Sequence, residues 1–327
     1  MKIGIIGLGS IGQRHIRILR ELGNVDIAAL RTKKGTLKKL PDDLLYVKEY
    51  MNPEVFYSLN LDGIIISNPT SLHIESMKIP LKKGIPVFVE KPMTTSIEEI
   101  KKLKNYDKSK VMVGFCLRYN EIIKTVKSFI SSGEIGKIYK ANLYCGHFLP
   151  FWHKYADYKQ EYFSVKSLGG GVLRTLSHEL DTTHYFFGKI RELCSSIEKL
   201  SDLEINVEDN SYIICRMHNN CLVTIELDYL NPICNRKGII FGSKGVLEYS
   251  FSEGISFIDY KGEIRKIMGN KNIDNNKMYV EQMKHFIKLI MKKEKPVCSY
   301  EDGLYVMQII EAAEKSMKLK SWQTVGV

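Results

Sequence analysis

The sequence predicts an α/β protein of two domains, in which a parallel sheet with crossover helices is followed by an α+β domain with a large, mostly antiparallel open sheet. Three observations lead to this prediction. The chain has 327 residues, which is too long for one ordinary core. Short apolar strands alternate with helices over residues 1–120, and later the strands follow one another directly. The hydrophobic fraction of 44% and the charged fraction of 26% are typical of globular proteins.

The first part of the chain reads as strands separated by amphipathic helices. The strands are expected at residues 3–6, 25–30, 63–67, 86–89 and 111–115, and the helices at residues 12–22, 71–83 and 96–105. Strands joined in this way form parallel sheets, because a parallel connection must cross over the sheet. We therefore expect a first domain at residues 1–118.

After residue 118 the pattern changes. A helix is expected at residues 121–131, and then strands at residues 138–145, 193–200, 210–217, 222–230, 238–241, 246–249 and 255–258. Turn sequences between several of these strands favour antiparallel neighbours. A helix at 169–187 would lie against the sheet, and helices at 278–292 and 300–318 would follow it. The second domain is expected at residues 119–327, and its C-terminal helix could pack back on the first domain.

The first expected strand runs into a glycine-rich turn, Gly7-Leu8-Gly9-Ser10-Ile11-Gly12, and a helix follows at once. The first glycine permits a tight turn, the second lets a pyrophosphate approach the backbone, and the third lets the helix pack close to the strand. The N–H groups of the first helical turn would then face the phosphates. The motif predicts a doubly wound Rossmann domain that binds a dinucleotide. Its expected contacts are Gly7, Gly9, Ser10, Ile11 and Gly12.

The end of the second strand bears on the choice between NAD and NADP. Arg31-Thr32-Lys33-Lys34 stands where an acidic residue would bind the ribose 2′-hydroxyl of NAD, and Arg31 lies 19 residues after Gly12. An arginine beside a hydroxyl suits a 2′-phosphate, so we expect cofactor contacts from Arg31 and Thr32 and a preference for NADP over NAD. The alternative is that these residues are solvated loop charges.

Polar residues also follow the strand at 63–67, where an open α/β sheet binds its ligands. Ser67, Asn68 and Pro69 stand at the end of this strand and are expected to contact the cofactor. His73 in the following helix could reach a ribose or a phosphate, although a histidine at such a place is about as often incidental.

The strand at 86–89 ends in Glu90-Lys91-Pro92. A lysine at this edge points toward the nicotinamide end of the crevice, and both Glu90 and Lys91 are expected to contact the cofactor. The Lys91 ammonium could hydrogen-bond a substrate hydroxyl and favour alkoxide character as hydride leaves. Pro92 would fix the turn, and a cis peptide is one way of doing so. Taken alone, Lys91 could equally be a surface lysine before a loop.

Five motifs occur in a fixed order: GLGSIG, SNPT with a following histidine, EKP, VGFCLRYN and GGGVLRTLSHELD. Together they resemble the glucose–fructose oxidoreductase, inositol dehydrogenase and rhizopine-catabolism (Gfo/Idh/MocA) family, by motif over roughly residues 1–190. The resemblance implies a second domain whose open sheet packs in oligomers, as a homodimer or homotetramer. It also implies hydride transfer between NAD(P) and a carbon of a sugar, cyclitol or nucleotide sugar. The segment 147–181 is most similar to members from nonulosonic-acid and surface-polysaccharide sugar pathways.

Carried over residue by residue, the resemblance places the family lysine at Lys91 and the proton-shuttling histidine at His178, so these two are the expected catalytic residues. The family's usual aspartate precedes that histidine by three or four residues, where this chain has Thr175 and Arg174. The segment therefore has the placement of a catalytic segment but lacks the acid that normally assists it.

Three interpretations of this missing acid stay open. Lys91 and His178 could suffice, with Thr175 hydrogen-bonding the substrate. Asp181 or Glu179 could replace the acid, although Asp181 lies almost one turn beyond His178 and could instead pin the helix. The protein could also bind dinucleotide and sugar with attenuated catalysis. A purely structural histidine at a domain boundary is the remaining alternative.

The other expected substrate contacts are Arg118, His147, Trp152 and Tyr162, together with Thr175 and His178. Arg118 follows the last strand of the first domain and could meet an anion or brace the domain interface. The three aromatic residues lie in a loop-rich segment before the glycines, and their flat faces suit stacking on a sugar or a nucleobase. The alternative is an irregular segment that packs against the crevice or a neighbouring subunit.

Composition narrows the classes of partner. The formal charge of +11 fits an anionic partner or lysines on solvated helix faces, and no arginine-rich cluster interleaved with aromatics suggests nucleic acid. The seven scattered cysteines, with no CxxC pair, argue against a disulfide framework and a metal site. No apolar run approaches the ~20 residues needed to cross a bilayer. The start of the chain lacks a signal-peptide pattern, so we expect a cytoplasmic protein without membrane contact.

Overall fold

The structure is a computed structural model, which describes residues 1–32, 37, 39–152, 157–269, 274 and 276–326. The chain divides into two compact units. The first contains Met1–Cys116 and Asn276–Leu304, and the second contains Leu117–Asn275 and Tyr305–Val327. Residues 276–304 thus fall in the first unit, whereas the sequence analysis assigned them to the second domain.

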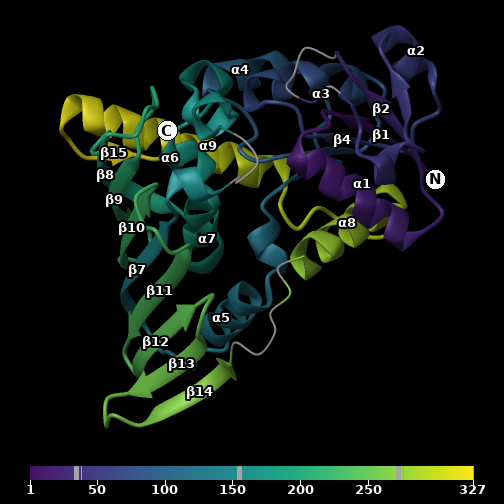
Figure 1. Cartoon of the computed structure of the whole chain (residues 1–327). Helices are drawn as coiled ribbons and strands as arrows, with labels where there is room; N and C mark the ends of the chain where they lie inside the picture. Colours follow the sequence, from purple (N-terminus) through teal and green to yellow (C-terminus); the bar gives the residue numbers. More distant parts are fainter. Residues whose placement is uncertain (33–36, 38, 153–156, 270–273, 275, 327) are drawn as a thin grey trace. The chain divides into compact units, whose positions relative to one another are not determined.

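The first unit is built on a parallel sheet with the strand order β3-β2-β1-β4-β5-β6, of which Figure 1 labels β1, β2 and β4. Its strands are β1 (Lys2–Ile6), β2 (Asp26–Leu30), β3 (Lys48–Tyr50), β4 (Gly63–Ile66), β5 (Val87–Val89) and β6 (Val111–Val113). The strands β4, β5 and β6 are buried along their whole length, as the apolar strands of parallel sheets are. The order reverses between β1 and β4, which is the arrangement of the doubly wound Rossmann sheet.

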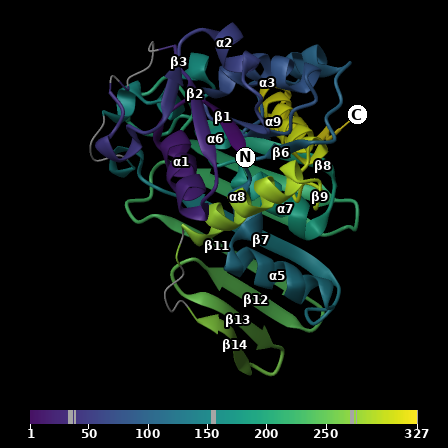
Figure 2. The same ribbon diagram turned by 90° about the vertical axis from the view of Figure 1, so that its right-hand side faces the viewer.

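Helices connect these strands, and one more comes from a distant part of the chain. They are α1 (Ser10–Leu22), α2 (Pro53–Ser58), α3 (His73–Lys82), α4 (Ile97–Ile100) and α8 (Lys277–Ile290). The helix α8 lies beside α1 (Figure 2). Its Phe286 ring is 5.8 Å from the Phe88 ring, and Ile290 fills the space where Gly63 lacks a side chain. The core of the first unit is therefore completed by residues from the last part of the chain.

The second unit is built on a sheet with the order β14-β13-β12-β11-β7-β10-β9-β8-β15. Its strands are β7 (Ile138–Gly146), β8 (Ile190–Glu198), β9 (Asn210–Met217), β10 (Leu222–Asp228), β11 (Asn235–Gly242), β12 (Gly245–Ser250), β13 (Gly254–Asp259), β14 (Ile264–Gly269) and β15 (Gln323–Thr324). Among the described strands β7 and β10 pair in parallel and the other neighbours pair antiparallel. The predicted fold class of both parts is confirmed.

Helices cover one face of this second sheet. The helix α5 (Glu121–Ser131) packs on β12 and β13, and α7 (His178–Phe187) packs on β7 and β10 (Figure 1). The short helix α6 (Val172–Thr175) contacts β9 and β10, and α9 (Tyr300–Leu319) belongs to this unit from Tyr305 onward. Along β9 the buried Ile213 and Cys215 alternate with the exposed Tyr212 and Arg216, so the other face of the sheet is open.

Two predictions about elements need correction. The single helix expected at 169–187 starts later and is two helices. Gly169 and Gly171, with φ of 88° and 111°, precede the first helix, and the backbone leaves the helical region at Leu176 before α7 begins. The strands β3, β14 and β15, which stand at the ends of their sheets, were not predicted. No helix within the described residues is long and apolar enough to cross a membrane.

Candidate active site

The glycine-rich turn joins β1 to α1 at the carboxyl edge of the parallel sheet. Gly7 has φ 97°, and a Cβ built there would lie 2.4 Å from the backbone nitrogen of Asn68. A Cβ on Gly12 would lie 2.3 Å from the Gly7 oxygen, so neither position accepts a side chain. A Cβ on Gly9 would meet no described protein atom within 4 Å, so a ligand can approach the backbone there.

The residues after Gly9 begin α1. Ser10 and Ile11 form its first turn, and Gly9 caps it without a side-chain hydrogen bond. The N–H groups of such a turn lack helical partners and attract anions. Both predicted residues therefore present backbone N–H groups at the place where the predicted pyrophosphate would lie.

The end of β4 supports the glycine turn. The Ser67 hydroxyl donates to the Gly7 oxygen at 2.8 Å, and the Asn68 amide donates to Ser76 Oγ at 2.9 Å. Asn68 Oδ1 is buried and has no hydrogen-bond partner among the described residues, while Pro69 is exposed. A buried acceptor next to an anion-binding turn suits a donor of a bound dinucleotide, so these residues fit the expected cofactor.

His73 lies inside the first unit, with 1% of its surface exposed. Its Nδ1 is 3.0 Å from the Pro92 oxygen, and its Nε2 is 2.8 Å from the Asn68 oxygen. A neutral imidazole can donate to only one of these carbonyls, and burial lowers the pKa of His73. The ring thus joins the end of β4 to the turn after β5. Its contact with the cofactor stays a prediction.

Arg31 follows β2, and its side chain is only 6% exposed. The guanidinium donates to Glu49 Oε1 at 2.5 Å and to the Leu37 oxygen at 2.7 Å. Thr32 is exposed, and Lys33 and Lys34 lie outside the described residues. The charge that was expected to bind a 2′-phosphate is therefore paired with a carboxylate of β3, which the sequence analysis did not single out.

Lys91 follows β5 at the same edge of the sheet, is half-buried, and precedes Pro92 through a cis peptide. The neighbouring Glu90 is buried, with its Oε1 2.7 Å from His15 Nε2. Its Oε2 accepts from the Lys91 backbone N–H at 3.3 Å. The carboxylate of Glu90 is therefore bound inside the unit, directly beside the predicted catalytic lysine.

In the second unit, His178 is the first residue of α7 and is 9% exposed. The positions of the missing acid are occupied by Thr175, which is buried, and Arg174, whose guanidinium pairs with Glu314 of α9 at 2.5 Å. Arg174 therefore holds α6 against α9.

Both acids that follow His178 are paired with arginines. Arg118 donates to both oxygens of Asp181 at 2.7–3.2 Å, and the two side chains are 5% and 1% exposed. Arg236 donates to Glu179 at 2.5 Å. These pairs bind α7 to neighbouring elements, and they argue against either carboxylate as a substitute for the missing acid.

Three predicted substrate residues belong to one aromatic cluster. The His147 and Trp152 rings stack at 5.5 Å, and the Trp152 indole donates to the His147 oxygen at 3.1 Å. Trp152 also meets Phe163 at 5.1 Å, and Phe163 meets Tyr162 at 5.4 Å. Burial lowers the pKa of His147. The next residues, 153–156, lie outside the described part of the chain.

Two residues of this region were missed by the sequence analysis. Tyr229 is fully buried, meets Trp152 at 5.4 Å and lies near Thr175. Burial raises the pKa of its phenol well above the ordinary value, while the neighbouring Thr175 acts in the opposite direction. Glu208 accepts from the Leu173 N–H at 3.3 Å and fills the space beside Gly171. Burial raises the pKa of Glu208. Neither residue belongs to a motif, and only their contacts with distant residues indicate a role.

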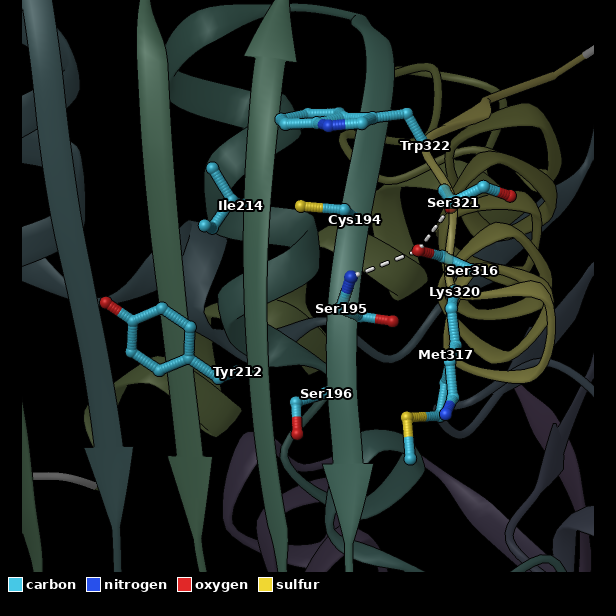
Figure 3. Close-up of a pocket in the computed structure, with 10 residues that line it drawn as sticks. All are labelled: Cys194, Ser195, Ser196, Tyr212, Ile214, Ser316, Met317, Lys320, Ser321 and Trp322. Carbon is cyan, nitrogen blue, oxygen red and sulfur yellow. Dashed lines mark hydrogen bonds between the residues drawn. The ribbon is translucent and has the colours of Figure 1, made fainter.

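The second unit also contains a groove of about 460 Å³ between β8, β9 and the end of α9 (Figure 3). Its walls include Cys194, Tyr212, Ile214, Met317 and Trp322, and none of the predicted site residues lines it. In Figure 3 the Trp322 ring lies beside Cys194 and Ile214. The groove therefore opens on the uncovered face of the sheet. No group of possible metal ligands was found among the described residues.

Two family models match the chain. Residues 1–115 match the model described as an oxidoreductase family with an NAD-binding Rossmann fold, and residues 123–248 match the GFO/IDH/MocA C-terminal domain. The first match contains all six strands of the first sheet, and the second contains the strands β7 to β11 and most of β12.

Similar proteins cover nearly the whole chain. Myo-inositol 2-dehydrogenase of Thermotoga maritima is 25% identical over 98% of this chain and 97% of its own. The solved structure of levoglucosan dehydrogenase in complex with NADH has a TM-score of 0.84 at 17% identity, over 100% and 99% of the two chains. The WlbA dehydrogenase of Bordetella pertussis, in complex with NADH and UDP-GlcNAcA, has a TM-score of 0.82 at 18% identity with the same coverage. These two structures support the fold.

Proposed function

Because the chain belongs to the Gfo/Idh/MocA family of oxidoreductases, we propose that it transfers a hydride between a nicotinamide dinucleotide and a hydroxyl- or keto-bearing carbon of a sugar or nucleotide sugar. The observation that carries this proposal is the edge of the first sheet. The glycine turn follows β1, Lys91 follows β5, and only β4 separates these two strands. A dinucleotide bound at the turn can extend along this edge toward Lys91.

The roles of the residues follow from their chemistry. The nicotinamide ring, when bound, exchanges the hydride with the reacting carbon. The Lys91 ammonium donates a hydrogen bond to the reacting oxygen and stabilises the negative charge that develops there. His178 accepts the hydroxyl proton during oxidation and returns it during reduction, since an imidazole can both take up and release a proton. We assign no proton-transfer role to Asp181 or Glu179, because both carboxylates are bound to arginines.

Substrate binding is assigned to the aromatic cluster and the segment before His178. His147, Trp152 and Tyr162 offer flat apolar faces with polar edges. The ligand named with the similar WlbA structure is a nucleotide sugar, and the similar myo-inositol 2-dehydrogenase is named for a cyclitol. Both classes belong in the test. Arg118 is assigned to stability, because Asp181 takes its guanidinium.

For the cofactor we propose NAD(H) over NADP(H), which reverses the preference expected from the sequence. The Arg31 charge is compensated by Glu49, and this carboxylate would repel a 2′-phosphate. The family model describes NAD binding, which agrees with this choice.

The proposal is tested by binding first and turnover second. Calorimetry with NAD⁺, NADH, NADP⁺ and NADPH measures the affinity for each nucleotide. Absorbance at the NADH band then follows turnover of myo-inositol, scyllo-inositol, levoglucosan and UDP-GlcNAcA. We expect NAD⁺-dependent turnover of one of these substrate classes. In Lys91→Ala and in His178→Asn, kcat should fall about 10²–10⁴-fold while the affinity for the nucleotide is kept. If the protein bound a nucleotide but turned over none of these substrates, the proposed hydride transfer would be contradicted and only nucleotide binding would remain. If it bound no nucleotide, the whole proposal would be refuted.

We also propose that a second copy of the chain packs on the open face of the nine-stranded sheet of the described chain, giving a homodimer or homotetramer. Tyr212 and Leu222 are each 40% exposed there, and the groove of Figure 3 opens on the same face. Light scattering after size-exclusion chromatography measures the mass in solution. A monomer at micromolar concentration, or an oligomer that survives Tyr212→Lys together with Leu222→Lys, would contradict this assignment.

A further inference from the structure

His15 is a buried polar residue that the proposed chemistry does not use. It lies in the second turn of α1 with 0% of its surface exposed, and the edge of its ring meets Phe88 at 5.2 Å. The neighbouring Ile16, Ile18 and Leu19 of α1 are also buried, so a leucine at position 15 would suit the same core. The imidazole must therefore be explained by a polar contact.

That contact is with Glu90. His15 Nε2 lies 2.7 Å from Glu90 Oε1, and a carboxylate can only accept, so Nε2 must carry the proton. The Nδ1 atom of His15 is buried and has no hydrogen-bond partner in the described part of the chain. Burying that second nitrogen without a partner costs stability, which an apolar side chain would avoid. The contact with Glu90 is thus what a histidine provides at position 15 and a leucine would not.

Glu90 makes further contacts besides the one with His15. Its backbone N–H donates to Ile66 of β4 at 2.9 Å. A Cβ on Gly114 would lie 2.9 Å from Glu90 Oε2, so this carboxylate oxygen occupies the space that a side chain there would need. The same Oε2 accepts from the Lys91 N–H at 3.3 Å. The carboxylate therefore fixes the peptide from which the Lys91 side chain starts.

We propose that His15 is a positioning residue for hydride transfer: it orients the Glu90 carboxylate, and Glu90 fixes the backbone of Lys91. This inference rests on the role of Lys91 proposed above. A lysine with four rotatable bonds reaches one oxygen reproducibly only if its backbone is fixed, and small displacements of a catalytic group lower the rate strongly. In this role His15 acts only through Glu90 and touches neither the substrate nor the reacting atoms.

The test compares His15 with another buried histidine of the same unit. His285 in α8 is 9% exposed, binds the Lys295 oxygen at 2.7 Å and lies 3.3 Å from Glu294. It is therefore a second buried histidine beside a glutamate, but its partners are not Lys91 or Glu90. We expect His15→Leu to lower kcat by about 10–100-fold while the KM for NAD⁺ changes less than about threefold. We expect His285→Leu to leave kcat within about threefold at a similar loss of Tm.

Conservative variants separate positioning from packing. Gln at position 15 can still donate to Glu90, whereas Asn is too short to reach it. His15→Gln should recover most of kcat and His15→Asn should resemble His15→Leu. If His15→Leu does not fold, this second pair decides the matter. The double variant His15→Leu/Glu90→Gln should be no slower than the slower single variant, because both act through one contact.

A measurement without turnover keeps the inference testable if the proposed activity fails. Hydrogen exchange of nucleotide-free protein, read from peptides that cover Lys91, should be faster in His15→Leu than in wild type and unchanged in His285→Leu. An inactive wild type with this exchange difference would overturn the proposed function but keep the positioning contact. Unchanged exchange together with unchanged kcat, or equal losses for the two histidine variants, would overturn the role of His15.

Discussion

The two units of this chain build their predicted sites in different ways. In the first, the site is made largely of backbone: a turn in which Gly7 and Gly12 exclude side chains, the start of α1 and the end of β5. In the second, it is made of side chains that meet across long stretches of sequence, such as Trp152 with Tyr229. A nucleotide shared by many proteins can be bound by a common backbone, whereas a particular substrate needs particular side chains.

The largest expected effect tests how far the second unit depends on charged pairs. Arg118→Met leaves the Asp181 carboxylate buried without its partner, and we expect a loss of about 3–5 kcal/mol in the free energy of unfolding. Denaturation with urea measures it. Arg118→Met/Asp181→Leu should regain most of the loss, because no charge is then left buried. A loss below about 1 kcal/mol for the single variant would mean that the pair is solvated.

The next effect tests whether the first unit is a backbone site. Gly9→Val should keep the stability of the wild type but weaken NAD⁺ binding by about 100-fold, because only the ligand needs that space. Gly12→Val should lose stability as well as binding, since its side chain would meet the Gly7 oxygen. Calorimetry and thermal unfolding separate the two results. Equal behaviour of the two variants would contradict the different reasons assigned to the two glycines.

The choice of nucleotide in the first unit depends on the side-chain pair of Arg31 and Glu49. Glu49→Gln removes the negative charge beside Arg31, and we expect the affinity for NADP⁺ to rise on the order of tenfold, as for a unit charge acting over roughly 10 Å. The affinity for NAD⁺ should change little. Titration of both nucleotides at low salt measures the ratio, and an unchanged ratio would show that Arg31 does not face the 2′ position.

A smaller effect is expected for the phenol behind the second site. Tyr229→Phe removes the buried phenol hydroxyl beside Thr175 but keeps the ring against Trp152, so kcat/KM for the sugar should fall about 3–10-fold. Thr175→Val should have a similar effect, and the two together should not add. Steady-state kinetics at saturating nucleotide measures this. If Tyr229→Phe changed only the KM for NAD⁺, the residue would act on nucleotide binding and not on the sugar, which would contradict this prediction.

The smallest effect concerns the stability of the segment before His178. Burial raises the pKa of Glu208 in the folded protein, so the unfolded chain releases this proton at a lower pH. Wild-type stability is therefore reduced as pH rises above the unfolded pKa, until the folded pKa is passed. Glu208→Gln should raise Tm by about 2 °C near pH 8 and leave it unchanged near pH 4. A larger gain at pH 4 than at pH 8 would contradict the direction of the shift.

The same contrast explains what the sequence could predict. Gly12 and Lys91 lie at fixed places relative to strands that their own neighbours define, so local pattern and family resemblance suffice to find them. Tyr229 and Glu208 could not be found, because their roles depend on contacts with Thr175 and Gly171 far away in the chain. The pairing of Arg31 with Glu49 was missed for the same reason, as β3 was not predicted.

Residues 276–304 belong to the first unit although they lie far along the chain, and this affects how the unit folds during protein synthesis. The segment 1–116 leaves the ribosome long before α8, which supplies Phe286 beside Phe88 and Ile290 beside Gly63. Until then this apolar surface stays open to solvent and to chaperones. A gene fragment cut at the apparent domain boundary should therefore yield an aggregation-prone product, and a nucleotide-binding module taken from this protein should carry α8 as a fused or co-expressed piece.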